Sequence, residues 1–265
     1  MSTVATRPVT RGNGFSNALG DIGAMVGREL RRSSRSVDSL VTAIIIPVSI
    51  MLVFVVVFGG AIQKDGNYIN YVVPGTLILC TGFVSAMTAI AVAQDMTSGT
   101  IDRFKTMPMF GPAPLIGHVV TSVVRNLATT VAVVGVALLL GFHPQASVGG
   151  WFAAAGFLAL SIIAFTWLSC AAGLVLSVDA AGSMNFVFLF LPYLSTGFVA
   201  IGTMPVWLRG FSTYQPFTPI IETLRRLLSG TSLDGYGWAA LAWLVGIGVV
   251  SYVASTILYR RQVAR

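Results

Sequence analysis

Charge is the scarcest property of this 265-residue sequence. Only 9% of its residues are Asp, Glu, Lys or Arg, whereas 55% are hydrophobic, and soluble domains carry roughly 25% charged residues. The mean hydropathy is +0.83. So few ionisable groups exclude an ordinary soluble domain, and we expect membrane lipids to surround most of the chain.

The motifs of catalytic and metal-binding chains are also missing. No GxxxxGK[ST] phosphate loop, HExxH or GxSxG is present, which excludes P-loop ATP hydrolysis within this chain. The two cysteines, Cys80 and Cys170, lie in apolar runs without CxxC spacing, and His118 and His143 stand at opposite ends of one run. We therefore predict no catalytic residue, metal site or bound cofactor, and no nucleic-acid partner.

Long apolar runs dominate the sequence instead. About 20 apolar residues cross a hydrocarbon core as a helix, and six runs reach that length: about 40–62, 72–94, 116–141, 150–177, 183–202 and 237–259. The prediction is an all-α integral membrane protein with six transmembrane helices in one domain, 15–259. We expect a disordered leader over 1–14 without a removable signal peptide, and a basic tail over 260–265.

The distribution of Lys and Arg predicts the orientation. Six basic residues precede the first run, three lie in the tail and two in the segment 95–108, against four in the loops of the opposite side. Because basic residues are enriched in cytoplasmic loops, both termini and segment 95–108 are expected inside the cell.

An amphipathic helix is predicted ahead of the first run. Its apolar residues recur at helical spacing, and they are Phe15, Leu19, Ile22, Val26 and Leu30. Such a helix lies in the membrane interface or packs on the protein itself.

The segment from Asp95 to Pro108 is a polar island between two apolar runs. It offers a turn, exposed charges, an aromatic anchor and a terminating proline, at Asp95, Gly99, Asp102, Arg103, Phe104, Lys105 and Pro108. Either it docks a partner as a short cytoplasmic helix or it is a solvated loop.

A second polar segment lies between the fifth and sixth runs. Its short apolar stretches are too broken to cross a bilayer, so they predict a re-entrant helical hairpin at the outer mouth. The residues assigned to this outer gate are Met204, Pro205, Trp207, Pro216, Pro219, Glu222 and Arg225. Glu222 can pair with Arg225 and Arg226 to support a helix, or act as a gate latch or substrate contact.

These two segments together resemble type-2 ABC transporter permeases of the daunorubicin-resistance, DrrB-like branch. The resemblance rests on the acidic residue, the Gly, Asp102-Arg-Phe104 and the Pro in that order, and on the block from Ser195 to Leu228. One departure is Phe110-Gly-Pro112, where the relatives often carry another basic residue. The resemblance implies an elbow helix before the first span and a coupling helix that sits in a groove of the ATPase subunit.

Four side chains inside the runs are possible pathway residues. Arg125 either faces the protein interior or extends its long side chain to the inner interface. Phe54, Met87 and Phe188 either line an apolar path or simply pack.

The resemblance implies a permease of a bacterial plasma membrane that exports hydrophobic drugs or lipids. Two ATPase subunits, which bind ATP and Mg, and a second permease copy or a paralogue would complete it. An exporter of lipid-linked glycans or complex lipids is the alternative, and an ATP-independent carrier or channel is the remote one.

Overall fold

The computed structural model of the chain describes residues 14–35, 37–59, 68–98 and 113–263. Within these residues every regular element is helical, which confirms the all-α prediction. The leader up to residue 13 and most of segment 95–108 lie outside the described residues.

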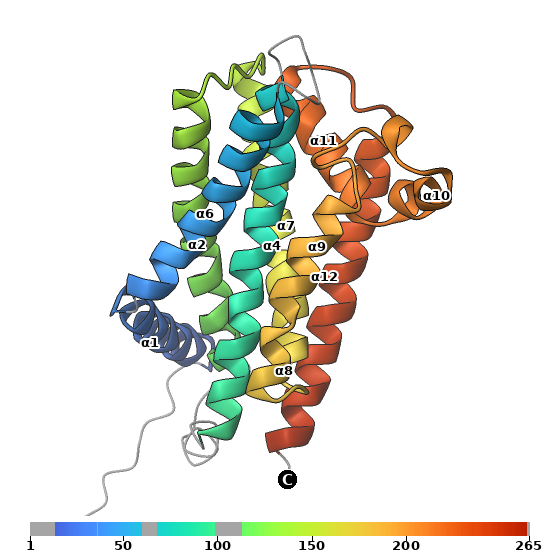
Figure 1. Cartoon of the computed structure of the whole chain (residues 1–265). Coiled ribbons are helices and arrows are strands. Elements are labelled where there is room, and N and C mark those ends of the chain that lie inside the picture. Colours follow the sequence, from blue (N-terminus) through green and yellow to red (C-terminus); the bar gives the residue numbers. More distant parts are fainter. Residues whose placement is uncertain (1–13, 36, 60–67, 99–112, 264–265) are drawn as a thin grey trace, which may run out of the picture.

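Five helical segments are long and apolar enough to cross a bilayer (Figure 1). They are α2 (Val37–Leu52) continued by the π-helix η1 (Val53–Phe58), α4 (Tyr68–Thr97), α6 (Ala113–Leu139), α7 (Val148–Gly173) and α12 (Asp234–Val263). Their positions match five of the six predicted spans. Helix α12 includes Arg260 and Arg261 in its last turn, so these basic residues belong to the helix.

The predicted fifth span, 183–202, is wrong as a single long helix. After the five-residue α8 (Val178–Gly182), α9 (Met184–Tyr193) is only ten residues long, about 15 Å at 1.5 Å per residue. The chain then turns, because Ser195 Oγ donates to the carbonyl of Pro192 at 2.6 Å and accepts from the N–H of Gly197 at 3.2 Å. Counting apolar residues could not detect this turn.

The outer segment forms two short helices, as predicted. After the 3-10 turn η2 (Ile201–Thr203), α10 (Val206–Tyr214) and α11 (Phe217–Ser229) follow. Helix α11 ends at Gly230, whose φ of +68° suits a glycine at this position.

Helix α4 is the centre of the bundle. Its most apolar window is 83% buried, against 17% for the windows of α2–η1 and α12. Small residues allow this packing: a Cβ on Gly75 would lie 2.3 Å from the carbonyl oxygen of Gly197, and one on Gly173 would lie 2.4 Å from that of Ala89. Helices α2, α6, α7, α8, α9 and α11 therefore pack around α4.

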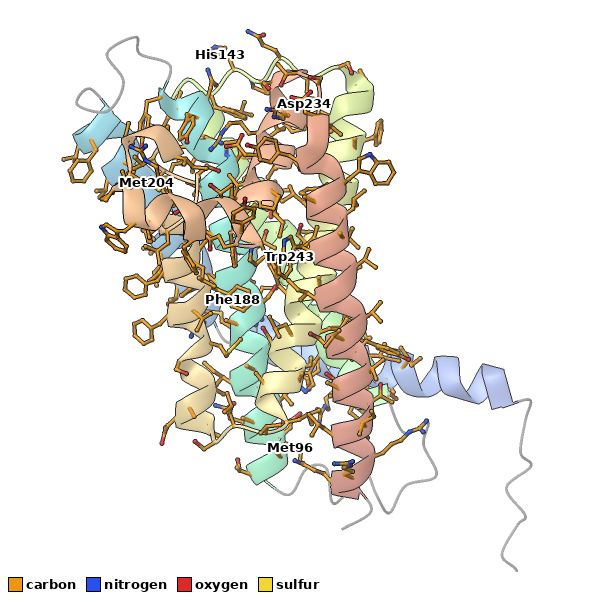
Figure 2. The ribbon with its side chains drawn as sticks, turned by 90° about the vertical axis from the view of Figure 1, so that its right-hand side faces the viewer. Met96, His143, Phe188, Met204, Asp234 and Trp243 are labelled. Atoms are coloured by element: carbon orange, nitrogen blue, oxygen red, sulfur yellow. The ribbon has the colours of Figure 1, made fainter. Side chains whose placement is uncertain are left out.

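Helix α1 (Gly14–Arg35) lies crosswise at the end of the bundle where α12 finishes (Figure 1). It packs on α6 at Gly117, where an added Cβ would be 3.1 Å from Cβ of Met25. Figure 2 marks the two ends of the bundle: Met96 lies at the end near α1, and His143 and Asp234 lie at the other. We call these the cytoplasmic and outer ends, following the predicted orientation.

Candidate functional site

The cytoplasmic end of α4 leads directly into the predicted coupling segment. Asp95 lies in the last turn of α4 and is 5% exposed. The other residues predicted to contact the ATPase lie outside the described residues, and they are Gly99, Asp102, Arg103, Phe104, Lys105 and Pro108. Only the root of this segment is therefore described.

Asp95 belongs to a buried ion cluster that joins three helices. Its Oδ2 accepts a hydrogen bond from Arg28 Nη2 of α1 at 3.0 Å and lies 3.1 Å from His118 Nε2 of α6. Glu29 of α1 completes the cluster, because its Oε1 accepts from Arg28 Nη2 at 2.5 Å and its Oε2 lies 3.6 Å from His118 Nδ1. We call these four residues the junction cluster.

The electrostatics of the junction cluster favour a rigid joint. The side chains of Glu29, Asp95 and His118 are 5–7% exposed, whereas that of Arg28 is 34% exposed. Burial raises the energy of an unpaired charge, so each carboxylate requires its cationic or hydrogen-bonding partner. Movement of the end of α4 is therefore coupled to α1 and α6.

The residue types of this cluster also suit a divalent cation. Ligand atoms of Glu29, Asp95 and His118 all lie within 4.8 Å of one another. Arg28, however, already bonds to both carboxylates, so their charge is balanced by a side chain. The two histidines lie far apart, as expected from the sequence. His118 lies beside two carboxylates, whereas His143 lies in the loop after α6.

Three members of the junction cluster were not anticipated from the sequence. In the sequence Arg28 and Glu29 are charged residues on the polar side of the amphipathic helix, and His118 has no histidine or cysteine partner nearby. The available signal was that ionisable residues near the ends of spans tend to find partners, but it does not say which spans are neighbours.

At the outer end, Arg225 of α11 binds to α4 and to the turn after α9. Its Nε and Nη2 donate to the carbonyl of Tyr71 at 3.2 and 3.0 Å, and Nη2 also donates to the carbonyl of Thr196 at 2.7 Å. The guanidinium stands 3.9 Å from the ring centroid of Tyr71 and pairs with Glu222. Arg225 thus fastens the outer hairpin to the central helix.

The other predicted outer residues lie at or near the starts of α10 and α11. Pro205 and Pro216 precede α10 and α11, Met204 and Pro219 are buried, and Trp207 is exposed. The expected pairing of Glu222 with Arg226 is not formed among the described residues. Arg226 instead pairs with Asp234 and donates to the carbonyl of Ser232 at 2.7 Å.

Three of the four possible pathway residues lie in or against one hydrophobic core. Phe188 is buried, with its ring centroid 5.2 Å from that of Phe165, so in this conformation it packs in the core. Phe54 is half-buried and its ring centroid lies 4.5 Å from that of Phe198. Met87 packs against the core from a half-buried position. All three side chains belong to or pack against the same core cluster, so their contacts do not set apart a separate path.

The side chain of Arg125 points into the protein, where it bonds to α4. Its Nη2 donates to the carbonyl of Val84 at 3.0 Å and lies 3.4 Å from Thr88 Oγ1, both on α4. Beside it, Asn126 Nδ2 reaches Ser85 Oγ at 3.3 Å, and Thr166 of α7 joins the same network. The sequence does not reveal this network, because single hydroxyl and amide groups in apolar runs do not indicate their partners. In a bilayer such groups strengthen helix packing.

Comparison with known proteins identifies the family of the chain. Residues 20–228 match the family described as "ABC-2 type transporter". The chain is similar to the daunorubicin resistance ABC transporter permease protein DrrB1 of Streptomyces coeruleorubidus, with 28% identity over 84% of this chain and 80% of the relative. It is also similar to the probable doxorubicin resistance ABC transporter permease protein DrrC of Mycobacterium tuberculosis, with 25% identity over 88% of this chain and 86% of the relative. The chain belongs to the ABC-2 type transporter family and is a multi-pass, DrrB-like membrane permease.

Proposed function

We propose that this chain is the membrane half of an ATP-driven exporter of hydrophobic drugs in a bacterial plasma membrane. Two copies, or this chain and a paralogue, would form the pathway, and two separate ATPase subunits would supply the energy. Support for the cargo class comes from the relatives, whose names refer to daunorubicin and doxorubicin resistance. ATP and Mg would bind to the ATPase subunits.

The observation that carries the mechanism is the position of the junction cluster. Asp95 lies four residues before Gly99, at the point where the coupling segment leaves α4. A force applied by a closing ATPase to the coupling segment, 95–108, acts on the end of α4, because the segment begins at Asp95 in the last turn of that helix. Arg28 and His118 then carry the displacement to α1 and α6, because both are bonded to Asp95.

Helix α4 would carry the same displacement to the outer side. It runs without interruption from Tyr68 to Thr97, and Tyr71 and Asp95 are separated by about 36 Å at 1.5 Å per residue. Tyr71 holds Arg225, so the outer hairpin is attached to the far end of the helix that the ATPase moves. Opening at the outer mouth would follow from release of this contact.

The test is co-purification with the ATPase encoded beside this chain, followed by ATP turnover in lipid. The triple change Asp102→Ala, Arg103→Ala and Phe104→Ala should abolish recovery of the complex or its coupled turnover while membrane insertion remains normal. The control is the variant His143→Ala, which changes an exposed residue at the outer end. Its complex recovery and ATP turnover should equal those of the unchanged chain.

Normal complex recovery and turnover by the triple variant would contradict the coupling mechanism. Failure of the unchanged chain to recruit any ATPase would favour the ion-gradient-driven carrier instead. Comparing drug susceptibility with extracted lipid in a deletion strain identifies the cargo: lipid accumulation without a change in drug susceptibility would replace drug export by export of complex lipids or lipid-linked glycans.

A further inference from the structure

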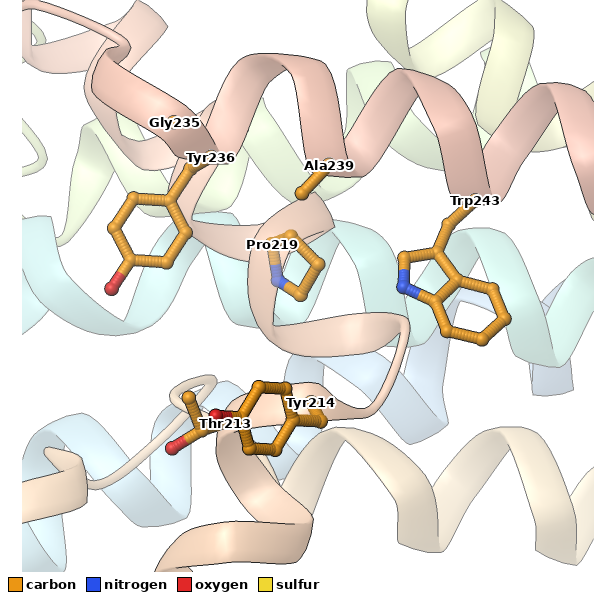
Figure 3. Close-up of a pocket in the computed structure, with 7 residues that line it drawn as sticks. All are labelled: Thr213, Tyr214, Pro219, Gly235, Tyr236, Ala239 and Trp243. Atoms are coloured by element: carbon orange, nitrogen blue, oxygen red, sulfur yellow. The ribbon is translucent and has the colours of Figure 1, made fainter.

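A cavity of about 310 Å³ opens beside the outer hairpin (Figure 3). Its walls come from the end of α10, the first turn of α11 and the first three turns of α12. The residues that line it include Thr213, Tyr214, Pro219, Tyr236, Ala239 and Trp243. None of these residues belongs to the junction cluster or to the Arg225 contact, and only Pro219 is among the residues assigned to the outer gate from the sequence.

The cavity lies at the depth of the outer leaflet. The sixth apolar run begins at about residue 237, and Trp243 lies six residues further along α12, about 9 Å into the hydrocarbon at 1.5 Å per residue. One leaflet contributes about 15 Å of a 30 Å hydrocarbon core. The cavity therefore extends from the outer interface towards the middle of the bilayer.

Polarity changes along the cavity in the direction expected for a lipid-like molecule. The hydroxyl groups of Thr213, Tyr214 and Tyr236 lie towards the Gly235 end, whereas Trp243 occupies the opposite end (Figure 3). Pro219 and Ala239 lie between the two ends and add only apolar surface there. Aromatic residues with one polar atom are suited to this interfacial depth.

A fixed ion pair stands beside the polar end. The guanidinium of Arg226 lies 5.0 Å from the ring centroid of Tyr236 and pairs with Asp234. The polar end thus offers hydroxyl groups and a paired cation and anion, a set that matches a hydroxylated or zwitterionic head group. The apolar end offers rings and a methyl group, which match a chain or a fused ring.

We infer that this cavity binds one outer-leaflet amphiphile, with its apolar body against Trp243 and its polar end beside Tyr236. The volume lies at the lower end of the range for small-ligand pockets, about 300 to 1,000 Å³, and accommodates a single chain or ring system rather than two chains. The occupant is either a lipid of the leaflet or the exporter's cargo as it leaves. Only the second source rests on the proposed function.

The test uses the full chain in phosphatidylcholine nanodiscs with Trp243 as the fluorophore. The other four tryptophans, Trp151, Trp167, Trp207 and Trp238, are changed to Phe. A lysophosphatidylcholine brominated on its chain is then titrated, because bromine quenches an indole only at contact. Saturable quenching is expected, and Ala239→Phe, which fills the cavity, should weaken the apparent affinity by at least about fivefold.

Two variants separate filling of the cavity from damage to the fold. Ala242→Phe adds the same bulk to the exposed surface of α12 outside the cavity lining and should leave saturation unchanged. Gly235→Leu narrows the polar end, where an added Cβ meets nothing within 4 Å, and should weaken binding as Ala239→Phe does. Linear quenching throughout, or equal binding by the Ala239→Phe and Ala242→Phe variants, would overturn the inference.

Competition by a hydrophobic drug identifies the source of the occupant. Reversal of the quenching by the drug would mark the cargo, whereas saturable quenching that the drug leaves unchanged would mark a lipid of the leaflet. The measurement needs no ATPase, so saturable binding in a chain that recruits no ATPase would leave this inference standing while the proposed function fails.

Discussion

Asp95 is the single residue on which the cytoplasmic end depends most directly. Changing Asp95 to Asn removes the charge that Arg28 and His118 face, leaving Glu29 as the only carboxylate of the junction cluster. Loss of one partner of a buried pair costs about 3–5 kcal/mol, and the partial exposure of Arg28 lowers this to about 2 kcal/mol. We expect a thermal unfolding midpoint in detergent roughly 5 °C lower.

Asp179→Asn is the matched control, because Asp179 is an exposed acid at the same end of the bundle. Its unfolding midpoint should equal that of the unchanged chain. Equal midpoints for both variants would show that the junction cluster contributes no stability.

Arg225→Lys tests, with a single residue, the contact of Arg225 with Tyr71 and Thr196 at the outer end. Lysine keeps the positive charge but cannot reach the carbonyls of Tyr71 and Thr196 together, as the guanidinium does. A loss of about 2 kcal/mol is expected, which corresponds to roughly 30-fold faster backbone hydrogen exchange in α11.

The adjacent Arg226→Lys provides the comparison for hydrogen exchange. Arg226 bonds to Asp234 and Ser232 near the start of α12 and not to α4. Exchange in α11 should therefore change little. Equal acceleration by the two variants would argue against a special role for Arg225.

At the scale of elements, close backbone contact decides how α4 packs. Gly75→Ala would place a methyl group 2.3 Å from the carbonyl oxygen of Gly197, and backbone atoms on both sides leave little room to adjust. We expect a loss of about 1–3 kcal/mol and a lower yield of folded protein, measured by size-exclusion chromatography and thermal unfolding.

Gly135→Ala in α6 supplies the opposite case. An added Cβ at Gly135 meets nothing within 4 Å, and alanine favours a helix over glycine by about 0.8–1.0 kcal/mol in soluble peptides. This variant should be at least as stable as the unchanged chain. Destabilisation of the same size at both positions would contradict the packing argument for Gly75.

The short α9 illustrates why one predicted element was wrong. Residues 183–202 are apolar enough to form a span, yet the helix ends at Tyr193 and the chain turns at Ser195 to Gly197. That turn packs on Gly75 of α4, more than a hundred residues earlier in the sequence. A local hydropathy window contains no information about such a partner.

At the scale of the whole molecule, the orientation is open to a direct test. Both native cysteines are buried, so they can be changed to Ala before a single reporter cysteine is introduced. In intact cells an impermeant maleimide should label Ser232→Cys, between α11 and α12, but not Ser177→Cys, before α8. Both positions are exposed in the structure.

Labelling of Ser177→Cys should appear only after the membrane is permeabilised. The reverse pattern would invert the predicted orientation. Labelling of both positions in intact cells would mean that the path through α9, α10 and α11 does not cross the bilayer, so the number of crossings would differ from six.

The sequence by itself determined that membrane lipid surrounds this protein and that the protein is helical. It also determined where five long helices lie and which family the chain resembles. Each of these follows from composition, run length or a local motif, because these properties depend only on residues that are close together in the sequence. Only the tertiary structure decided that Arg28, Glu29, Asp95 and His118 meet, that Arg225 holds Tyr71, and that α9 stops short. These contacts join distant segments, and their energies depend on which helices pack together and how closely, which local patterns do not encode.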